Sequence, residues 1–330
     1  MNMLRLFFST LFWSLLLGPL AFPPAVLGQK RFSIPPDAAA ILAKTPVPPP
    51  PNNVTGVDID RFIGSPFQSP NRLLNDAILT RVILRGGNPY EKGEHAAVLE
   101  YRKELALGTV LPYNLTSLAN IPDQLFIFVE DGKGRLDDGG EFWDLHEGIG
   151  VLIPPHVKFR IRNSSDVLLH MLMLTWSPQP GAKPASGIFV RDVDQLPLTT
   201  CGGEICHWSY FGKNIFNSSH GLAPREAFHL VYVPPMSIGE PHAHVKGWEE
   251  IWTKLPPYDS YLTLGSEIRE MPVNTAYLAP PNGKTVHAVI NLRKDKPESY
   301  LFIGTFIFDQ PDYGRDPLVA PQHLLDKSSN

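Results

Sequence analysis

The order of elements that the sequence predicts appears twice, about 125 residues apart, and this repeat limits the folds that the chain can adopt. Each copy has an apolar strand-like run, a glycine turn, a second run, a Pro-Pro pair, a third run and an asparagine. The copies are residues 124–129 with Pro154-Pro155 and Asn163, and residues 250–255 with Pro280-Pro281 and Asn291. So long a period indicates a duplicated domain, because solenoid repeats are much shorter.

Composition favours an all-β structure for both copies. Of 330 residues, 34 are proline and 26 are glycine, and the strand-like runs are short. Closely spaced turn residues between short strands are typical of β-barrels and sandwiches. We therefore predict two β-barrels in tandem, over residues 58–180 and 187–330. The Pro- and Gly-containing segment 176–187 has the composition of a linker between them.

The N-terminus has the features of an export signal. Arg5 supplies a positive charge, and the apolar run after it is too short to span a bilayer comfortably. We predict a signal peptide over residues 1–28, with an uncleaved membrane anchor as the alternative. Residues 29–57 form a proline-rich linker. Since no second apolar run is long enough to span a membrane, we expect a secreted protein, extracellular or periplasmic.

The net charge bears on the binding partners, and the cysteine content bears on disulfide bonding. The formal net charge of −4 gives no reason to expect nucleic acid. Cys201 and Cys206 could close a local disulfide in an oxidising compartment or remain two free thiols.

Four Asn-x-Ser/Thr sequons could carry glycans in a eukaryotic host, at Asn53, Asn114, Asn163 and Asn217. Asn114 and Asn163 are the less favoured acceptors, because they lie inside the repeat.

The second copy contains a set of residues typical of a metal site. His242 and His244 are two apart, so on a strand their side chains would point to one face. A glutamate, Glu249 or Glu250, begins the next apolar run, and His287 lies on a later one. Three imidazoles and a carboxylate suit a divalent transition metal such as Mn, Fe, Ni, Cu or Zn. Because neighbours on a strand alternate, only one glutamate can face inward, and the other should be solvated or salt-bridged.

These residues resemble the two motifs of the cupin superfamily, arranged as in a bicupin. A glycine followed by His-x-His and a glutamate is similar to His242, His244 and Glu250, or Glu249 in its place. Pro-x-Gly followed by His-x3-Asn is similar to residues 281–283, His287 and Asn291. The resemblance covers roughly residues 75–315 and implies jelly-roll barrels with a metal held by those four ligands. Glu250 is favoured because strand-forming Ile251 follows it, although Glu249 keeps the commoner spacing.

The first copy lacks the ligands. Its His-x-His position falls near Asn114 and Thr116, its glutamate position reads Gln124, and its third histidine position reads Phe159. We expect Phe126, Phe128 and Phe159 to fill this barrel with apolar side chains. The N-terminal barrel is then a structural or docking partner without a metal site.

Other residues near the motifs are weaker candidates. By alternation, Trp252 and Lys254 share the face of Glu250, and Lys254 could bind a substrate carboxylate or lie in water. Tyr277 or Tyr261 could donate a proton, although ordinary packing is favoured. Three histidines upstream of the motif, His207, His220 and His229, favour structural roles, although one could reach the pocket mouth.

The resemblance implies an enzyme acting on a small organic, phenolic or sugar acid by oxidation, decarboxylation or isomerisation. Bicupins also include seed storage and sugar-binding proteins, so a non-catalytic structural or sugar-binding bicupin is the alternative. A homodimer is expected by analogy alone, and fold does not fix the reaction.

Overall fold

The computed structural model describes residues 57–200, 210–224 and 226–306. The predicted signal peptide, almost all of the proline-rich linker, Asn53, both cysteines and His207 lie outside these residues. Within them, no helix is long and apolar enough to cross a membrane.

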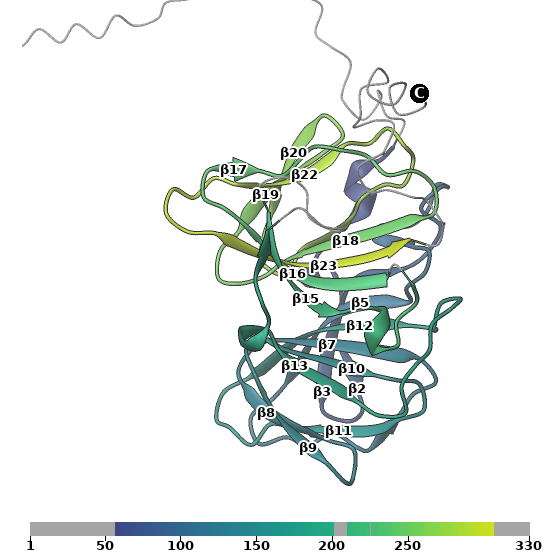
Figure 1. Cartoon of the computed structure of the whole chain (residues 1–330), viewed down its shortest axis with the longest axis vertical. Coiled ribbons are helices and arrows are strands. Elements are labelled where there is room, and N and C mark those ends of the chain that lie inside the picture. The colour runs from purple at the N-terminus through teal and green to yellow at the C-terminus, as the bar shows by residue number, and fades with distance from the viewer. Residues whose placement is uncertain (1–56, 201–209, 225, 307–330) are drawn as a thin grey trace, which may run out of the picture. The chain divides into compact units, whose positions relative to one another are not determined.

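Strands make up nearly all the regular structure (Figure 1). The first half contains η1 (Ile59–Phe62), β1 (Ile63–Gly64), η2 (Pro66–Gln68), β2 (Arg72–Leu74), β3 (Ile78–Gly86), β4 (Ala97–Leu99), β5 (Glu104–Val110), β6 (Ala119–Asn120), β7 (Gln124–Asp131), β8 (Lys133–Asp137), β9 (Phe142–His146), β10 (Ile149–Ile153), β11 (Lys158–Arg162) and β12 (Leu169–Trp176). The second half contains β13 (Phe189–Asp192), η3 (Val193–Gln195), β14 (Thr199–Thr200), β15 (Phe211–Phe216), η4 (Ser218–His220), β16 (Glu226–Val233), β17 (Ser237–Ile238), β18 (Trp248–Lys254), β19 (Ser260–Leu264), β20 (Glu267–Met271), β21 (Ala276–Leu278), β22 (His287–Asn291) and β23 (Glu298–Phe306).

Each half builds a large and a small sheet from these strands. In the N-terminal barrel, an eight-stranded sheet contains the order β13-β10-β7-β12-β5-β3-β2, with β4 beside β3, and the small sheet has the order β6-β11-β8-β9. In the C-terminal barrel, the sheets have the orders β1-β21-β18-β23-β16-β15-β14 and β17-β22-β19-β20. The prediction of an all-β protein with two jelly-roll barrels in tandem is confirmed.

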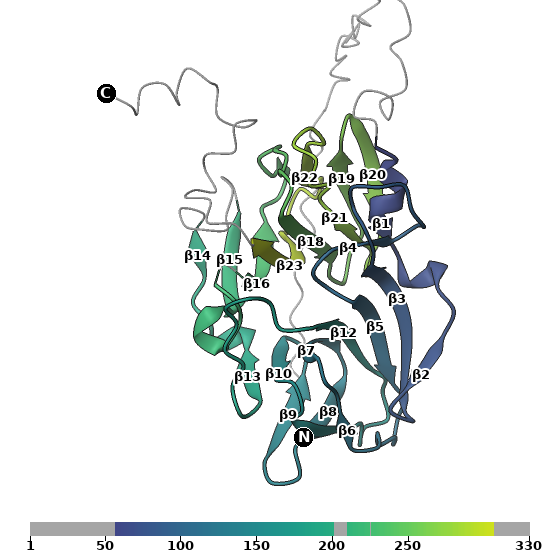
Figure 2. The ribbon, with the colours of Figure 1, turned by 90° about the vertical axis from the view of Figure 1, so that its right-hand side faces the viewer.

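The two barrels exchange edge strands across the predicted domain limits. Strand β1, at the start of the chain described, pairs with β21 of the C-terminal barrel, Ile63 opposite Tyr277. Strand β13, which follows the predicted linker, pairs with β10 of the N-terminal barrel, Val190 opposite Val151. Figure 2 shows β1 beside β21 and β13 beside β10. A cut at residues 180–187 would therefore remove one edge strand from each of the two large sheets.

The large sheets pack against each other through aromatic side chains. The ring of Phe228 lies 4.8 Å from that of Phe126 and 5.4 Å from that of Trp176. Phe126 and Phe128 thus belong to the core shared by the barrels, and our expectation that they fill the N-terminal barrel was wrong. Because strand side chains alternate, a one-residue error in assigning the inward face moves them to the opposite side.

Two asparagines at the ends of equivalent strands show the duplication in their hydrogen bonds. The Asn163 amide nitrogen donates to the carbonyls of Val110 and Val167, at 3.0 and 2.7 Å. The Asn291 amide nitrogen donates to the carbonyls of Val233 and Lys296, both at 2.9 Å. Both amides are buried at the ends of their strands. A glycan on Asn163 would replace one of the two N–H hydrogens and so remove at least one of these bonds.

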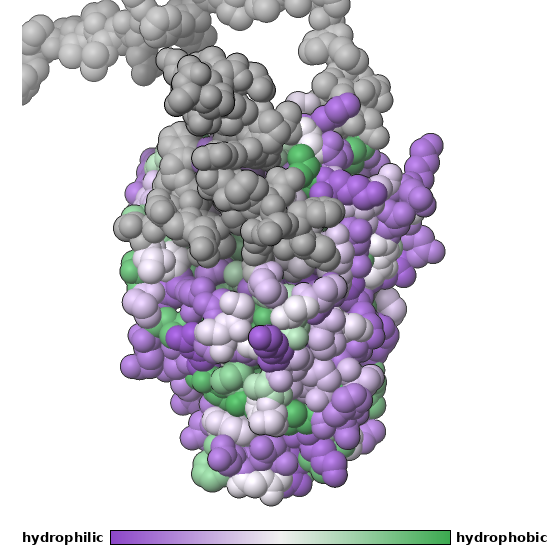
Figure 3. All heavy atoms as spheres, turned by 45° about the vertical axis from the view of Figure 1, so that its right-hand side comes forward, coloured by the Kyte–Doolittle hydropathy of each residue, from purple (hydrophilic) through white to green (hydrophobic). Residues whose placement is uncertain are grey.

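Figure 3 shows one face of the molecule coloured by hydropathy. Hydrophilic residues predominate there, and hydrophobic ones lie between them in small groups. Such a mixture is usual for protein surface in contact with water.

Candidate metal centre

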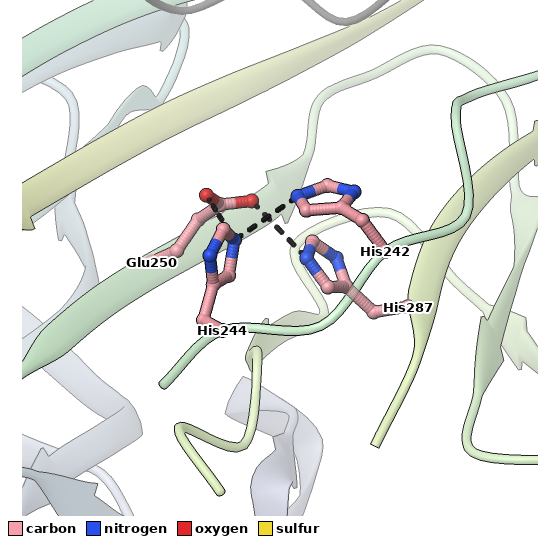
Figure 4. Close-up of side chains that lie close together, drawn as sticks. All are labelled: His242, His244, Glu250 and His287. Atoms are coloured by element: carbon pink, nitrogen blue, oxygen red, sulfur yellow. Dashed lines mark hydrogen bonds and ion pairs between the residues drawn. The ribbon is translucent and has the colours of Figure 1, made fainter. Parts of the chain in front are cut away.

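Three histidines and one glutamate meet inside the C-terminal barrel (Figure 4). His242 and His244 lie in the loop between β17 and β18, Glu250 is the third residue of β18, and His287 begins β22. The expectation that both His242 and His244 lie on a strand was wrong, since only His242 makes a β-bridge, with His287. The two rings still converge, because the backbone N–H groups and carbonyls of His242 and His287 bond reciprocally and the His244 carbonyl accepts from Gly283.

The ligand atoms of the four side chains point at a common centre. One nitrogen or oxygen from each residue lies within 4.8 Å of all the others. Nε2 of His244 lies 3.1 Å from Nε2 of His242 and 2.8 Å from Oε2 of Glu250. Nε2 of His287 lies 3.5 Å from Oε1 of Glu250. All four side chains are almost completely buried.

The opposite ring nitrogens of His242 and His287 are held by the surrounding protein. Nδ1 of His242 donates to the carbonyl of Glu240 at 2.8 Å, so Nε2 of a neutral ring carries the lone pair. Nδ1 of His287 lies 3.1 Å from the Tyr277 hydroxyl. Metal-binding histidines generally have such partners on the second nitrogen, which fix the tautomer and the ring orientation. The donor set therefore fits a divalent transition metal.

The electrostatics keep Glu250 ionised. Burial alone would raise the pKa of Glu250, but the neighbouring histidines, His244 foremost, hold that pKa well below its usual range. The Trp252 indole also donates to Oε1 of Glu250 at 2.6 Å. The carboxylate is thus oriented as a charged acceptor at the centre of the cluster.

Glu249 faces the opposite side of β18 and lies away from the cluster. Its Oε2 accepts from the backbone N–H groups of Glu100 and Tyr101 in the N-terminal barrel, at 2.5 and 2.9 Å. Burial raises the pKa of Glu249 to about 7. The sequence-based choice of Glu250 over Glu249 agrees with this geometry. The expectation that Glu249 is solvated or salt-bridged was wrong, because the N-terminal barrel covers it and it has no ion-pair partner among the described residues.

The two candidate catalytic side chains are placed differently. Tyr277 on β21 is fully buried, and its hydroxyl touches the His287 ring. Lys254 lies at the far end of β18 from the loop of His242 and His244, and its Nζ donates to the carbonyl of Leu255 at 2.7 Å. Lys254 is buried and not solvated, and that burial lowers its pKa to about 8. Tyr277 is therefore the one of the pair in contact with the cluster.

His229, for which the sequence favoured a structural role, lies in the interior of the C-terminal barrel. It lies opposite Phe302, which lies opposite Trp252, and directly opposed residues of a sheet share a face. Burial lowers the pKa of His229 to about 3, and neither ring nitrogen has a hydrogen-bond partner among the described residues. Its inward position could have been predicted from strand alternation along β16. His220, in contrast, contacts Arg191 at 3.0 Å and caps η4.

The described part of the N-terminal barrel contains no comparable cluster. Phe159, which corresponds to His287 in the repeat, is buried in the core of that barrel, as expected. Gln124 shares the face of Phe126, which packs on the other barrel, so Gln124 is not the counterpart of Glu250. The neighbouring residue, Leu125, faces the interior of the N-terminal barrel, and its side chain cannot bind a metal.

The comparisons with known proteins agree with this architecture. The profile of the Cupin domain family matches residues 122–175, which lie in the barrel without the ligand cluster. No curated protein matches the sequence. A putative glyoxylate-induced protein from Pseudomonas aeruginosa has a similar structure, with a TM-score of 0.59, 14% identity and coverage of 76% of this chain and 90% of that one.

Two further structures with both barrels are similar. The oxalate decarboxylase of Lactobacillus farciminis has a TM-score of 0.55, 12% identity and coverage of 82% of this chain and 93% of its own. The vicilin of Corylus avellana has a TM-score of 0.54, 11% identity and coverage of 74% and 85%. Residues 122–175 thus match the Cupin domain family, and the similar structures show that the chain has the two-barrel fold of these proteins.

Proposed function

We propose that this protein is a secreted, metal-dependent enzyme that acts on a small organic acid, a phenolic compound or a sugar acid. The reaction class is oxidation, decarboxylation or isomerisation. The observation that carries the proposal is the buried cluster of His242, His244, Glu250 and His287, whose ligand atoms all lie within 4.8 Å of one another. Four ligands of this kind would leave coordination positions of a six-coordinate ion open to a substrate.

Each protein residue has a definite task in this proposal. His242, His244, His287 and Glu250 would hold one divalent ion, Mn, Fe, Ni, Cu or Zn, which when bound supplies Lewis acidity and open coordination positions. The Glu240 carbonyl and the Tyr277 hydroxyl orient two of the imidazoles. The Trp252 indole orients the carboxylate.

The interior wall of the barrel favours a small, partly polar substrate. The rings of Trp252 and Phe302 pack edge to face, with centroids 5.1 Å apart and planes at 73°, and make this wall apolar. His229 lies 5.8 Å from the Phe302 ring on the same face and offers two ring nitrogens that no described residue engages. A neutral imidazole there can donate to a substrate carboxylate or hydroxyl. Leaving such a group buried without a partner is costly, which a bound polar ligand would offset.

The similar proteins support more than one candidate function. One is named for the decarboxylation of oxalate, which agrees with a small carboxylic acid as substrate, and another is a vicilin. A non-catalytic structural or sugar-binding bicupin is therefore the second candidate. Export and release from the membrane by signal cleavage belong to the same proposal and rest on the sequence. A homodimeric state also belongs to it and rests on analogy alone.

Elemental analysis of the full chain beside His242→Ala tests the metal centre. One equivalent of a transition metal in the wild type, lost in a folded variant, is the expected result. The loaded protein is then incubated with a panel of carboxylic, phenolic and sugar acids. Turnover of one of them that is lost in His242→Ala supports the enzyme, whereas metal without turnover or ligand-dependent spectral change favours the structural alternative. Absence of metal even after reconstitution contradicts the proposal.

A further inference from the structure

The segment between two of the proposed ligands is held by the other barrel. Residues 245–249 connect His244 to Glu250, so their path fixes the spacing of these two side chains. Gly247 turns the segment with a φ of +98°, which favours glycine. The segment needs external contacts to be rigid, because no described strand pairs with its first three residues.

Those contacts come from the N-terminal barrel. The Tyr90 hydroxyl accepts from the backbone N–H of Gly247 at 3.1 Å and donates to Oε2 of Glu100 at 2.6 Å. The Lys246 ammonium lies 4.8 Å from the centre of the Tyr90 ring. At the end of the segment, the Glu249 carboxylate accepts from the backbone N–H groups of Glu100 and Tyr101.

The loop that carries Tyr90 is itself anchored. The Arg61 guanidinium donates to four backbone carbonyls of this loop, including those of Asn88 at 2.7 Å and Ala97 at 3.0 Å. Arg61 lies in η1, two residues before Ile63 of β1, which pairs with Tyr277. Residues 61–64 thus contact two parts of the site. They hold the loop that carries Tyr90, and they pair with β21, whose Tyr277 contacts His287.

We infer that the N-terminal barrel, whose described residues include no ligand cluster, helps to set the geometry of the metal centre. Tyr90 of that barrel and Glu249 of β18 are the positioning residues. Tyr90 fixes Gly247, and Glu249 ties the start of β18 to the backbone at Glu100 and Tyr101. These bonds set the distance between His244 and Glu250 before an ion arrives. Loss of groups that orient ligands typically weakens metal affinity about 10- to 100-fold. The inference rests on the proposed metal site.

The test is a titration of the metal-free full chain with Co²⁺, followed by the visible spectrum of the bound ion. The variants are Tyr90→Phe and Glu249→Gln. Tyr90 is 36% exposed, so Tyr90→Phe is expected to fold. Two matched controls make the same chemical changes elsewhere. Tyr113→Phe removes an exposed hydroxyl of the same barrel, and Glu130→Gln alters a buried carboxyl that contacts Asn274 of the other barrel.

We expect Tyr90→Phe and Glu249→Gln each to raise the Kd for Co²⁺ about 10-fold or more and to shift the spectrum, with both controls like the wild type. Unchanged Kd and spectrum in the two folded variants would overturn the inference while leaving the metal site intact. An equal loss in Glu130→Gln would also overturn it, because general loosening between the barrels would then be the cause. Failure of the wild type to bind Co²⁺ would remove the metal site, and the inference with it.

Discussion

Glu249 and Glu250 are neighbours on β18, and their carboxylates serve opposite faces of one sheet. Oε2 of Glu250 lies 2.8 Å from the His244 ring inside the C-terminal barrel. Oε2 of Glu249 accepts two backbone N–H groups of the N-terminal barrel. A strand places consecutive side chains on opposite sides, so one peptide joins the proposed metal centre to the contact between barrels.

Tyr277→Phe should weaken metal binding without unfolding the protein. The change removes only the hydroxyl that lies 3.1 Å from Nδ1 of His287, so the ring is less firmly oriented. We expect a roughly tenfold higher Kd for the bound divalent ion, measured by competition with a chelator. Tyr261→Phe on β19 is the matched control and should bind like the wild type. Equal affinity in all three proteins would show that the hydroxyl does not support the ligand.

His229→Leu should separate stability from ligand binding. Since the imidazole is buried with no partner among the described residues, an apolar side chain of similar size should raise the unfolding temperature. Metal content should stay unchanged, because His229 is outside the ligand cluster. Affinity of the loaded protein for small carboxylates, measured by calorimetry, should fall about tenfold. A variant that binds such acids as well as the wild type would exclude His229 from substrate recognition.

Glu130 should make the protein less stable as pH rises. Burial raises the pKa of Glu130 to about 8, above the value of 4.5 expected in the unfolded chain. The folded state therefore holds its proton more tightly, and this contribution is complete below about pH 4.5 and is lost as pH rises through about 8. Glu130→Gln keeps the neutral form at all pH values. Urea unfolding at pH 5, 7 and 9 should show the variant gaining on the wild type at pH 9, and parallel curves would contradict the assignment.

Arg102 and Glu226 form an ion pair between the barrels, and both side chains are completely buried. Arg102→Met alone should cost about 3–5 kcal/mol of unfolding free energy, since it leaves a buried charge without its partner. The double change Arg102→Met with Glu226→Leu should recover most of this loss. Arg72→Met breaks the exposed pair with Glu104 and should cost at most about 1 kcal/mol. Urea unfolding measures all three variants, and a double variant no more stable than Arg102→Met would contradict this account of the pair.

Order and spacing of residues were enough to predict much of this molecule. The duplicated pattern of strand, Pro-Pro and asparagine predicted two barrels, because turn residues and alternating apolar runs are local properties of the chain. The same local reasoning predicted His242, His244, Glu250 and His287 as one group, and the structure brings them together. The choice of Glu250 over Glu249 depended only on the apolar residue that follows it.

Only the tertiary structure decided what depends on contacts between distant parts of the chain. Whether Phe126 faces its own barrel or the other depends on a register of one residue, which the apolar run 125–129 leaves open because both of its faces are buried. Contacts between residues more than 35 positions apart in the sequence decided four features. They are the pairing of β1 with β21, the pairing of β13 with β10, the bonds to the Glu249 carboxylate and the bond between Gly247 and Tyr90. The sequence therefore determined the two barrels and the candidate ligands, and packing between the barrels decided what surrounds them.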